Sequence, residues 1–325
     1  PLAVPGLEGT NVWTQVANAY PYPTSLEDSS DLEILVIETE TTVPVVYGDW
    51  FVATASVPPL YHDVLGLPGT LQELEVMLGV NVEDNIALTL TGSPLVARAG
   101  MIDSQVSSNN RVVERHFIET SSDDPGKLVD YEGAFWLSYD FASNSGKQNI
   151  VAHPLDFEED GGEVVFNLPN GLQGYFISDA VGTRLDTAPV DIVADPNGGE
   201  QGETIVNGRS CMKCHFAGLN EAEDIIHDLA SQGSLYPSAI AGQIQSLFNP
   251  SNFSNWFSDD QTTFKEALEE AAVSMVEQDV EEQIWVTGER HLETLSATDV
   301  SAHLYMSWEE LVSNPGAERL KSVPE

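Results

Sequence analysis

Cysteines, basic residues and long apolar runs are all scarce in this sequence. Its 325 residues include 2 cysteines, and 12 lysines and arginines stand against 52 aspartates and glutamates. So few cations exclude nucleic acid and anionic membrane surfaces as natural partners, because both attract basic proteins. The sequence contains no run of 18 apolar residues, so we expect no membrane-spanning helix.

The acidic residues give the chain a formal net charge of −40, and they are spread along the sequence instead of forming a tail. We interpret them mainly as a solvated surface, which favours solubility in strong salt and a marine or halophilic source. A cationic partner and surface-bound calcium are the alternatives. The acidic stretch 156–163 is the candidate calcium turn, but it lacks the ligand spacing of an EF-hand, so a solvated turn is preferred.

Both cysteines lie in the short stretch 208–216. Cys211 and Cys214 are three residues apart, and His215 follows the second directly. On a helix this spacing places the two thiols one turn apart, where both can add to the vinyl groups at one edge of a porphyrin. His215 can then coordinate the iron from the same turn. The stretch therefore predicts one covalent haem c on Cys211 and Cys214, with His215 as the proximal ligand.

Three other interpretations compete with haem attachment. A thioredoxin-like redox pair lies at a strand-to-helix junction, whereas residues 201–208 before the motif have the composition of a polar loop. A structural zinc site needs four ligands, and the sequence has no second cysteine pair and no histidine pair with zinc-finger spacing. Finally, the two cysteines and the histidine could be adjacent by chance. Haem attachment is preferred because cysteine and histidine are both rare in this chain.

Haem c is attached outside the cytoplasm in bacteria, so the motif also predicts export. The sequence begins at Pro1 and not at methionine, which we interpret as a mature chain after removal of a signal peptide, or as a chosen boundary. We therefore expect a periplasmic or extracellular location.

Composition and periodicity divide the chain into three segments. Residues 1–31 are rich in proline, tyrosine and serine, and we expect an extended arm lying on its own domain or on a neighbouring subunit. A homo-oligomer or filament built through this arm is one expectation. Residues 32–195 predict a β-rich domain with a few helices, and residues 196–325 predict a helical haem domain.

Local signals predict the main elements within these segments. Thr70 caps a helix that continues to Leu78, and Glu73 completes a capping box. The expected strands are 32–41, 111–118 and 134–141, followed by a hairpin over 163–178. The helices expected after the motif are 222–231, 237–247, 260–281, 299–306 and 308–312.

Several pieces of the chain, together with the haem motif, carry a family resemblance. In its motif and helical content, the haem segment resembles a class I cytochrome c. A wider part of the chain resembles a group of secreted bacterial single-haem proteins, through the pieces Asp49–Val52, Pro58–His62, Glu114–His116, Trp136–Phe141, His153–Leu155, Gly161–Glu163, Leu168–Leu172 and Asn207–His215. The resemblance implies one architecture and a haem, but no particular reaction. The expected fold class is therefore α+β, with a β-rich N-terminal domain followed by a mostly helical cytochrome c-like haem domain.

The motif leaves open which residue faces the iron opposite His215. A low-spin electron carrier needs a sixth ligand, whereas a catalytic haem keeps that position free. Met275 and Met306 fit helix interiors better than ligand loops. We therefore rank His153, in a proline-stiffened loop, first and His116 second, as an iron ligand or as a distal acid or base.

Two arginines close to His116 are expected to bind the haem as well. Arg111 and Arg115 lie on the same predicted strand, and each is a candidate partner of a haem propionate because guanidinium groups pair well with carboxylates.

Taken together, these features predict an exported cytochrome that transfers electrons to or from a redox partner protein. Two alternatives remain open. The large segment before the motif fits a peroxidase-like haem oxidoreductase with an open distal site, since a simple carrier needs only about 100 residues. The same segment could instead be a structural or assembly module that displays the haem.

Overall fold

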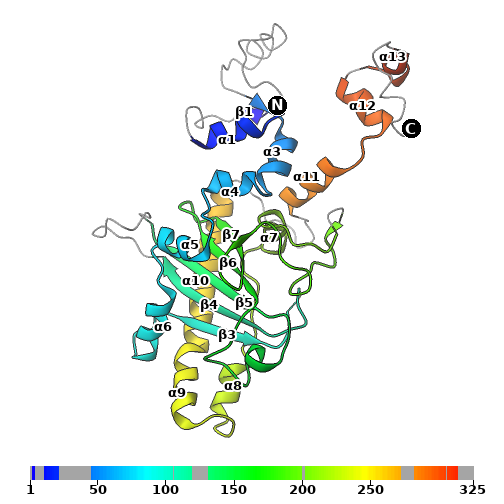
Figure 1. Cartoon of the computed structure of the whole chain (residues 1–325). Helices are drawn as coiled ribbons and strands as arrows, with labels where there is room; N and C mark the ends of the chain where they lie inside the picture. The colour runs from blue at the N-terminus through cyan, green and yellow to red at the C-terminus, as the bar shows by residue number, and fades with distance from the viewer. Residues whose placement is uncertain are drawn as a thin grey trace.

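The structure is a computed structural model, and it describes residues 2–3, 11–21, 45–104, 106–118, 131–199, 202–271, 282–304 and 306–313. Its centre is a six-stranded antiparallel sheet in which the strands lie side by side in chain order (Figure 1). The strands are β3 (Ala97–Met101), β4 (Arg111–Ile118), β5 (Gly133–Asp140), β6 (Gly161–Asn167), β7 (Gln173–Asp179) and β8 (Arg184–Leu185). Because each strand pairs with the next one along the chain, the sheet is a meander built from hairpin connections.

Alternation along the strands gives the sheet two faces with different coverings. Arg111 and Trp136 lie on one face, which we call the site face, and His116 and Phe135 lie on the other, which we call the opposite face. Arg115 pairs with Trp136 across β4 and β5, and Val165 pairs with Trp136 across β5 and β6, so these residues also belong to the site face.

Helices precede the sheet as well as follow it. Before it come α1 (Asn11–Ala19), α3 (Gly48–Ala55), α4 (Leu60–Leu65), α5 (Leu71–Leu78) and α6 (Val82–Leu90). The capping box predicted at Thr70 and Glu73 is confirmed, and it starts α5. Helix α6 lies in the segment predicted to be β-rich, and Asn81 caps it by accepting a hydrogen bond from the backbone N–H of Asp84. An Asn85–His116 hydrogen bond of 3.3 Å places α6 on the opposite face.

After the sheet the chain is helical, as the period predicted. The helices are α7 (Arg209–Cys214), α8 (Ile226–Ser231), α9 (Ser238–Leu247), α10 (Pro250–Glu270), α11 (Gln283–Leu292), α12 (Ala297–Leu304) and α13 (Trp308–Ser313). The long helix α10 crosses the sheet on its site face (Figure 1), where Phe253 and Phe257 meet the Trp136 ring edge to face at 5.3 and 6.2 Å.

The expected fold class is wrong. It placed a β-rich N-terminal domain before a separate cytochrome c-like helical domain, whereas helices make up 43% and strands 17% of the described residues and no cytochrome domain is shown. Leu74 before the sheet, Phe135 within it and Phe253 after it belong to one apolar core, which also includes Cys211. Helices α8, α9 and α10 bury apolar residues against the sheet, whereas α11 packs against α3 and α7, so these helices share their cores with the rest of the chain.

The N-terminal segment lies on its own chain wherever the structure describes it. Strand β1 (Leu2–Ala3) pairs with β2 (Val45–Val46), and α1 packs against α4 with Val16 fully buried. The expected extended arm therefore contains a helix, and the apolar stripe of that helix explains why it is held to the rest of the chain. The strand predicted at 32–41 lies outside the described residues.

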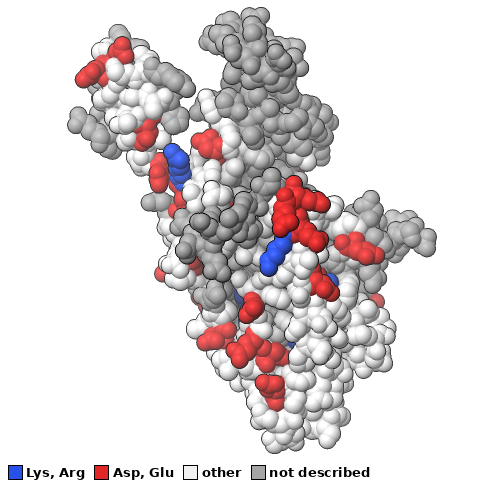
Figure 2. All heavy atoms as spheres, turned by 180° about the vertical axis from the view of Figure 1, so that it is seen from behind, with Lys and Arg blue, Asp and Glu red and all other residues white. Residues whose placement is uncertain are grey.

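Acidic side chains are spread over the surface seen in Figure 2, and basic ones are few. In the part of the chain that the structure describes, no helix is both long enough and apolar enough to cross a membrane.

Candidate functional site

The motif lies on a single helical turn, as its spacing predicted. Helix α7 begins after Gly208, which has a φ of 91° and lies so close to the chain that a Cβ there would be 2.5 Å from the Ser56 carbonyl oxygen. The backbone N–H of His215 donates to the carbonyl of Cys211 at 2.8 Å. Both cysteines and the histidine are therefore presented by the same turn.

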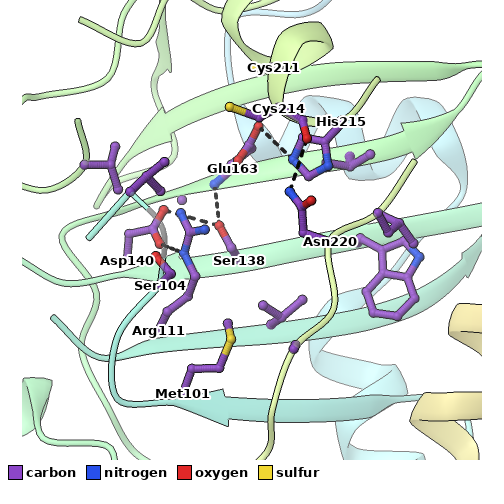
Figure 3. Close-up of a pocket in the computed structure, with 18 of the residues that line it drawn as sticks. Met101, Ser104, Arg111, Ser138, Asp140, Glu163, Cys211, Cys214, His215 and Asn220 are labelled. Atoms are coloured by element: carbon purple, nitrogen blue, oxygen red, sulfur yellow. Dashed lines mark hydrogen bonds and ion pairs between the residues drawn. The ribbon is translucent and has the colours of Figure 1, made fainter. Parts of the chain in front are cut away.

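This turn forms one end of a cavity of about 520 Å³ between the sheet, α7 and α10. Cys211, Cys214 and His215 lie at that end in Figure 3. The walls are mostly apolar and come from strands, loops and α10, including Val113, Val165, Ile177, Ile192, Val193, Phe253 and Phe257. A cavity of this size and character is typical of sites for cofactors and other small molecules, which occupy about 300–1,000 Å³.

The His215 ring is oriented by a backbone carbonyl. Its Nδ1 lies 3.2 Å from the carbonyl oxygen of Gly218, and because a carbonyl can only accept, Nδ1 carries the proton. Nε2 is then the ring nitrogen that remains to coordinate a metal. Tyr175 stacks on the ring at a centroid distance of 5.9 Å and an angle of 29°.

Both thiols are held in their protonated form. Burial, followed by the nearby carboxylate of Glu163, raises the pKa of Cys211 well above its ordinary value and raises that of Cys214 to about 11. A nucleophilic redox pair needs a thiol whose pKa is lowered. The surroundings of these cysteines therefore give no support to the thioredoxin-like alternative.

The zinc alternative finds no support either. Among the described residues, no group of three or more histidine, cysteine, aspartate or glutamate side chains is arranged to hold a metal ion. Two carboxylates of the acidic turn considered for calcium already have partners in the protein. Asp156 pairs with Lys147 and His153, and Asp160 accepts from the Ala142 backbone N–H and the Gln148 amide at 2.7 and 2.6 Å.

A polar strip crosses the cavity floor on β4, β5 and β6. Glu163 is its residue nearest the motif, with Oε1 3.9 Å from His215 Nε2. The backbone N–H of Glu163 donates to Ser138 Oγ at 3.1 Å, and Ser138 Oγ donates to Asp140 at 3.3 Å. Asp140 in turn forms an ion pair with Nε of Arg111. The strip thus links the motif end of the cavity to Arg111.

Of the two arginines predicted to bind haem, the structure brings one into the cavity. Arg111 lines the cavity, and its side chain is 14% exposed. Arg115 lies on the same face but is engaged elsewhere: it donates twice to Asp260 on α10, at 3.1 and 3.2 Å, and its guanidinium lies 3.7 Å from the Phe117 ring centroid.

Neither histidine proposed as a sixth ligand reaches the cavity. His116 is fully buried on the opposite face, where Nε2 lies 2.7 Å from Glu114. His153 is a partly exposed loop residue paired with Asp156 at 3.1 Å. Side chains along a strand alternate between its two faces, so β4 cannot direct both Arg111 and His116 into the cavity.

Sequence reasoning did not single out three side chains that line the cavity: Glu163, Asp140 and Ser104. Glu163 and Asp140 belong to pieces that carried the family resemblance, and the presence of each acidic residue in a mostly apolar predicted strand was the available signal. Ser104 lies in a loop with no pattern.

No family model matches the chain, and neither the curated proteins nor the solved structures include a match to it.

Proposed function

We propose that this chain carries one haem c, bound covalently through Cys211 and Cys214 with His215 as the proximal ligand, and that it transfers electrons. The observation that carries the proposal is the convergence of these three side chains at one end of a mostly apolar cavity of about 520 Å³. Since Nδ1 of His215 faces the Gly218 carbonyl, Nε2 is the nitrogen that would act as iron ligand. When bound, haem supplies a one-electron redox centre.

The protein's own residues would then do three things. The α7 turn places two thiols for thioether bonds, and the Gly218 carbonyl fixes the tautomer and orientation of His215. The apolar walls exclude water, which keeps the effective dielectric constant low around the redox centre. Attachment of haem c outside the cytoplasm makes this an exported protein, with a redox protein as its partner.

A peroxidase-like reaction is the second candidate, and one observation favours it. Apart from His215, no histidine is found among the described residues that line the cavity. Met101 lines it, but β3 is three strands from β6, so Met101 lies on the order of 14 Å from Glu163 at a strand spacing of about 4.8 Å. A haem whose second axial position has no protein ligand is open to substrate.

Mass spectrometry tests the attachment. The chain made in a host competent for cytochrome c maturation should gain the mass of one haem, and the gain should survive extraction with acidified acetone. Replacing both cysteines (Cys211→Ser, Cys214→Ser) should abolish the gain. An unmodified chain with two free thiols from the same host would contradict the proposal.

The absorption spectrum separates the two candidate functions. A six-coordinate low-spin spectrum supports the electron carrier, and a high-spin spectrum supports the oxidoreductase. His153→Gln serves as a matched control because His153 lies outside the cavity, so this variant should keep the spectrum of the unaltered protein. A change from low to high spin in this variant would instead make His153 the sixth ligand.

A further inference from the structure

A second polar site lies in the cavity, away from the motif. Among the described residues that line the cavity, Arg111 is the only lysine or arginine. Figure 3 shows it beside Asp140 and Ser104, on the side of the cavity away from the motif cysteines and His215. A buried cation in an apolar cavity is costly unless it is paired, so its surroundings indicate what it binds.

Asp140 satisfies only part of the Arg111 guanidinium. The carboxylate pairs with Nε of Arg111, and its other oxygen accepts from the Ser138 hydroxyl at 3.3 Å. A guanidinium has five N–H donors, and the two Nη atoms carry four of them. Asp140 thus orients the side chain and leaves the Nη edge for another acceptor.

Ser104 supplies an independent indication of a ligand. Its Oγ is buried and has no hydrogen-bond partner, although the side chain lines the same cavity. A buried hydroxyl without a partner loses the free energy of its hydrogen bonds to water. An acceptor bound between Ser104 and Arg111 would satisfy both groups.

The register of the sheet sets how far this site is from the motif. Strands β4 and β6 are separated by β5, so Arg111 and Glu163 stand about 10 Å apart across the sheet at a strand spacing of about 4.8 Å. Glu163 is 3.9 Å from His215 Nε2. A flat ring that contacts His215 therefore has room to extend along the polar strip toward Arg111 within the same cavity.

We propose that Arg111, oriented by Asp140 and assisted by Ser104, binds a carboxylate at this end of the cavity, and that the carboxylate is a propionate of the porphyrin. The inference rests on the proposed function and adds to it the direction in which the ring lies. Planar guanidinium and carboxylate groups form two parallel hydrogen bonds, which fix orientation as well as affinity. Arg111 is accordingly a binding residue and Asp140 a positioning residue.

The test uses the full chain made without haem attachment, together with two metal-free porphyrins, one with two free carboxylates and one with both esterified. Binding is followed by quenching of tryptophan fluorescence, since Trp136 lines the cavity. The dicarboxylate should bind at least about tenfold more tightly than the diester, as expected for a charge-assisted pair. Equal binding of the two, or no binding of either, would overturn the proposal.

Variants then assign the preference to Arg111. Arg111→Gln alone leaves Asp140 without its cation, so the double variant Arg111→Gln with Asp140→Asn keeps the site neutral and of similar shape. The double variant should bind the two porphyrins equally. Arg184→Gln is the matched control, because Arg184 donates to the Leu67 and Pro68 carbonyls outside the cavity, and it should keep the preference. A preference that survives in the double variant would contradict the assignment.

A benzoate-binding measurement distinguishes a porphyrin propionate from a small free carboxylic acid as the ligand of Arg111. If benzoate binds in an Arg111-dependent way while the two porphyrins bind equally, the site serves a small carboxylic acid and the propionate assignment is overturned. None of these measurements depends on iron or on the thiols. A negative result in these binding measurements is therefore distinct from a failure of covalent haem attachment, which is measured by the mass of the matured chain.

Discussion

At the scale of single residues, two carboxyl groups on the opposite face of the sheet illustrate how neighbours determine charge. Burial alone would raise the pKa of both. For Glu114 the cation Arg98 and then His116 reverse the effect of burial and lower the pKa to about 2. Glu75 has no such partner: burial first, then the negative charges of Glu114 and Glu83, raise its pKa to about 7.

Glu75→Gln should stabilise the protein in a pH-dependent way. A carboxyl whose pKa is raised on folding favours the native state most below its unfolded pKa, near 4.5, and this advantage is lost as pH rises through about 7. At pH 8 the variant should therefore be about 1–2 kcal/mol more stable than the unaltered protein, after allowing for solvent screening of a half-buried group. Near pH 4 the difference should vanish.

Urea denaturation at the two pH values measures this difference. The exposed residue Glu132 provides the control, and Glu132→Gln should change stability little at either pH. A Glu75→Gln variant that is destabilised at pH 8, or whose stability relative to the unaltered protein is the same at both pH values, would show that folding does not raise the pKa of Glu75.

Two glycines are expected to respond oppositely to the same substitution. A Cβ on Gly162 in β6 would lie 2.2 Å from the Ser138 carbonyl oxygen, so Gly162→Ala should cost about 1–3 kcal/mol. A Cβ on Gly242 in α9 would have nothing within 4 Å, so Gly242→Ala should stabilise by about 0.5–1 kcal/mol through helix propensity. Urea midpoints with unchanged m-values measure both effects, and a Gly162→Ala protein of unaltered stability would refute the close approach.

The candidate site could be predicted from the sequence only where rarity gave a signal. Two cysteines in 325 residues made the motif visible, and the scarcity of cations drew attention to Arg111. His153 was chosen for its proline-stiffened loop and His116 for its place on a basic strand, and neither feature shows that a side chain reaches the cavity. Glu163 is one of 52 acidic residues, and its place in a predicted strand did not show that it lies beside His215.

At the scale of elements, α10 is joined to the sheet by a buried polar contact as well as by aromatic rings. Asp260 accepts two hydrogen bonds from Arg115 and one, at 2.8 Å, from the indole N–H of Trp136. All three side chains are almost fully removed from solvent. Asp260 therefore fixes the position of α10 along β4 and β5, and with it the wall of the cavity.

Asp260→Ala should be strongly destabilising. It would leave the Arg115 cation and the Trp136 N–H buried without their partner, at a cost of about 3–5 kcal/mol. The neighbouring Asp259 is exposed, so Asp259→Ala should stay within about 0.5 kcal/mol of the unaltered protein. Chemical denaturation of the two variants side by side makes the comparison, and similar stabilities would mean that α10 is held by its aromatic contacts alone.

Elements with their own local signals were predicted correctly, whereas their assembly was not. The helix α5, the strands β4 and β5 and the hairpin of β6 and β7 are confirmed, because capping, alternation and turn residues are encoded locally. The separate helical domain was wrong because an amphipathic period shows that a helix has an apolar face and does not show what covers it. In this protein the sheet covers α10.

At the scale of the whole molecule, five of the basic side chains in the described part of the chain are paired with carboxylates. Arg98, Arg111, Arg115, Lys147 and Lys213 each pair with an aspartate or glutamate. Most of the 52 acidic residues therefore have no basic partner, since 12 lysines and arginines exist in total. The surface seen in Figure 2 accordingly carries scattered negative charge with little positive charge between.

This charge distribution predicts a protein that is stabilised by salt. Like charges spread over the surface repel one another more strongly in the compact native state than in the expanded unfolded chain. Salt screens this repulsion over about 10 Å at 0.1 M, so the thermal midpoint at neutral pH should rise with sodium chloride. A midpoint that stays flat or falls up to molar salt would contradict the argument.

A variant with fewer charges separates screening from general effects of salt. Glu266→Gln with Glu270→Gln removes two exposed like charges spaced i, i+4 on α10, and it should raise the midpoint at low salt and reduce its slope against salt concentration.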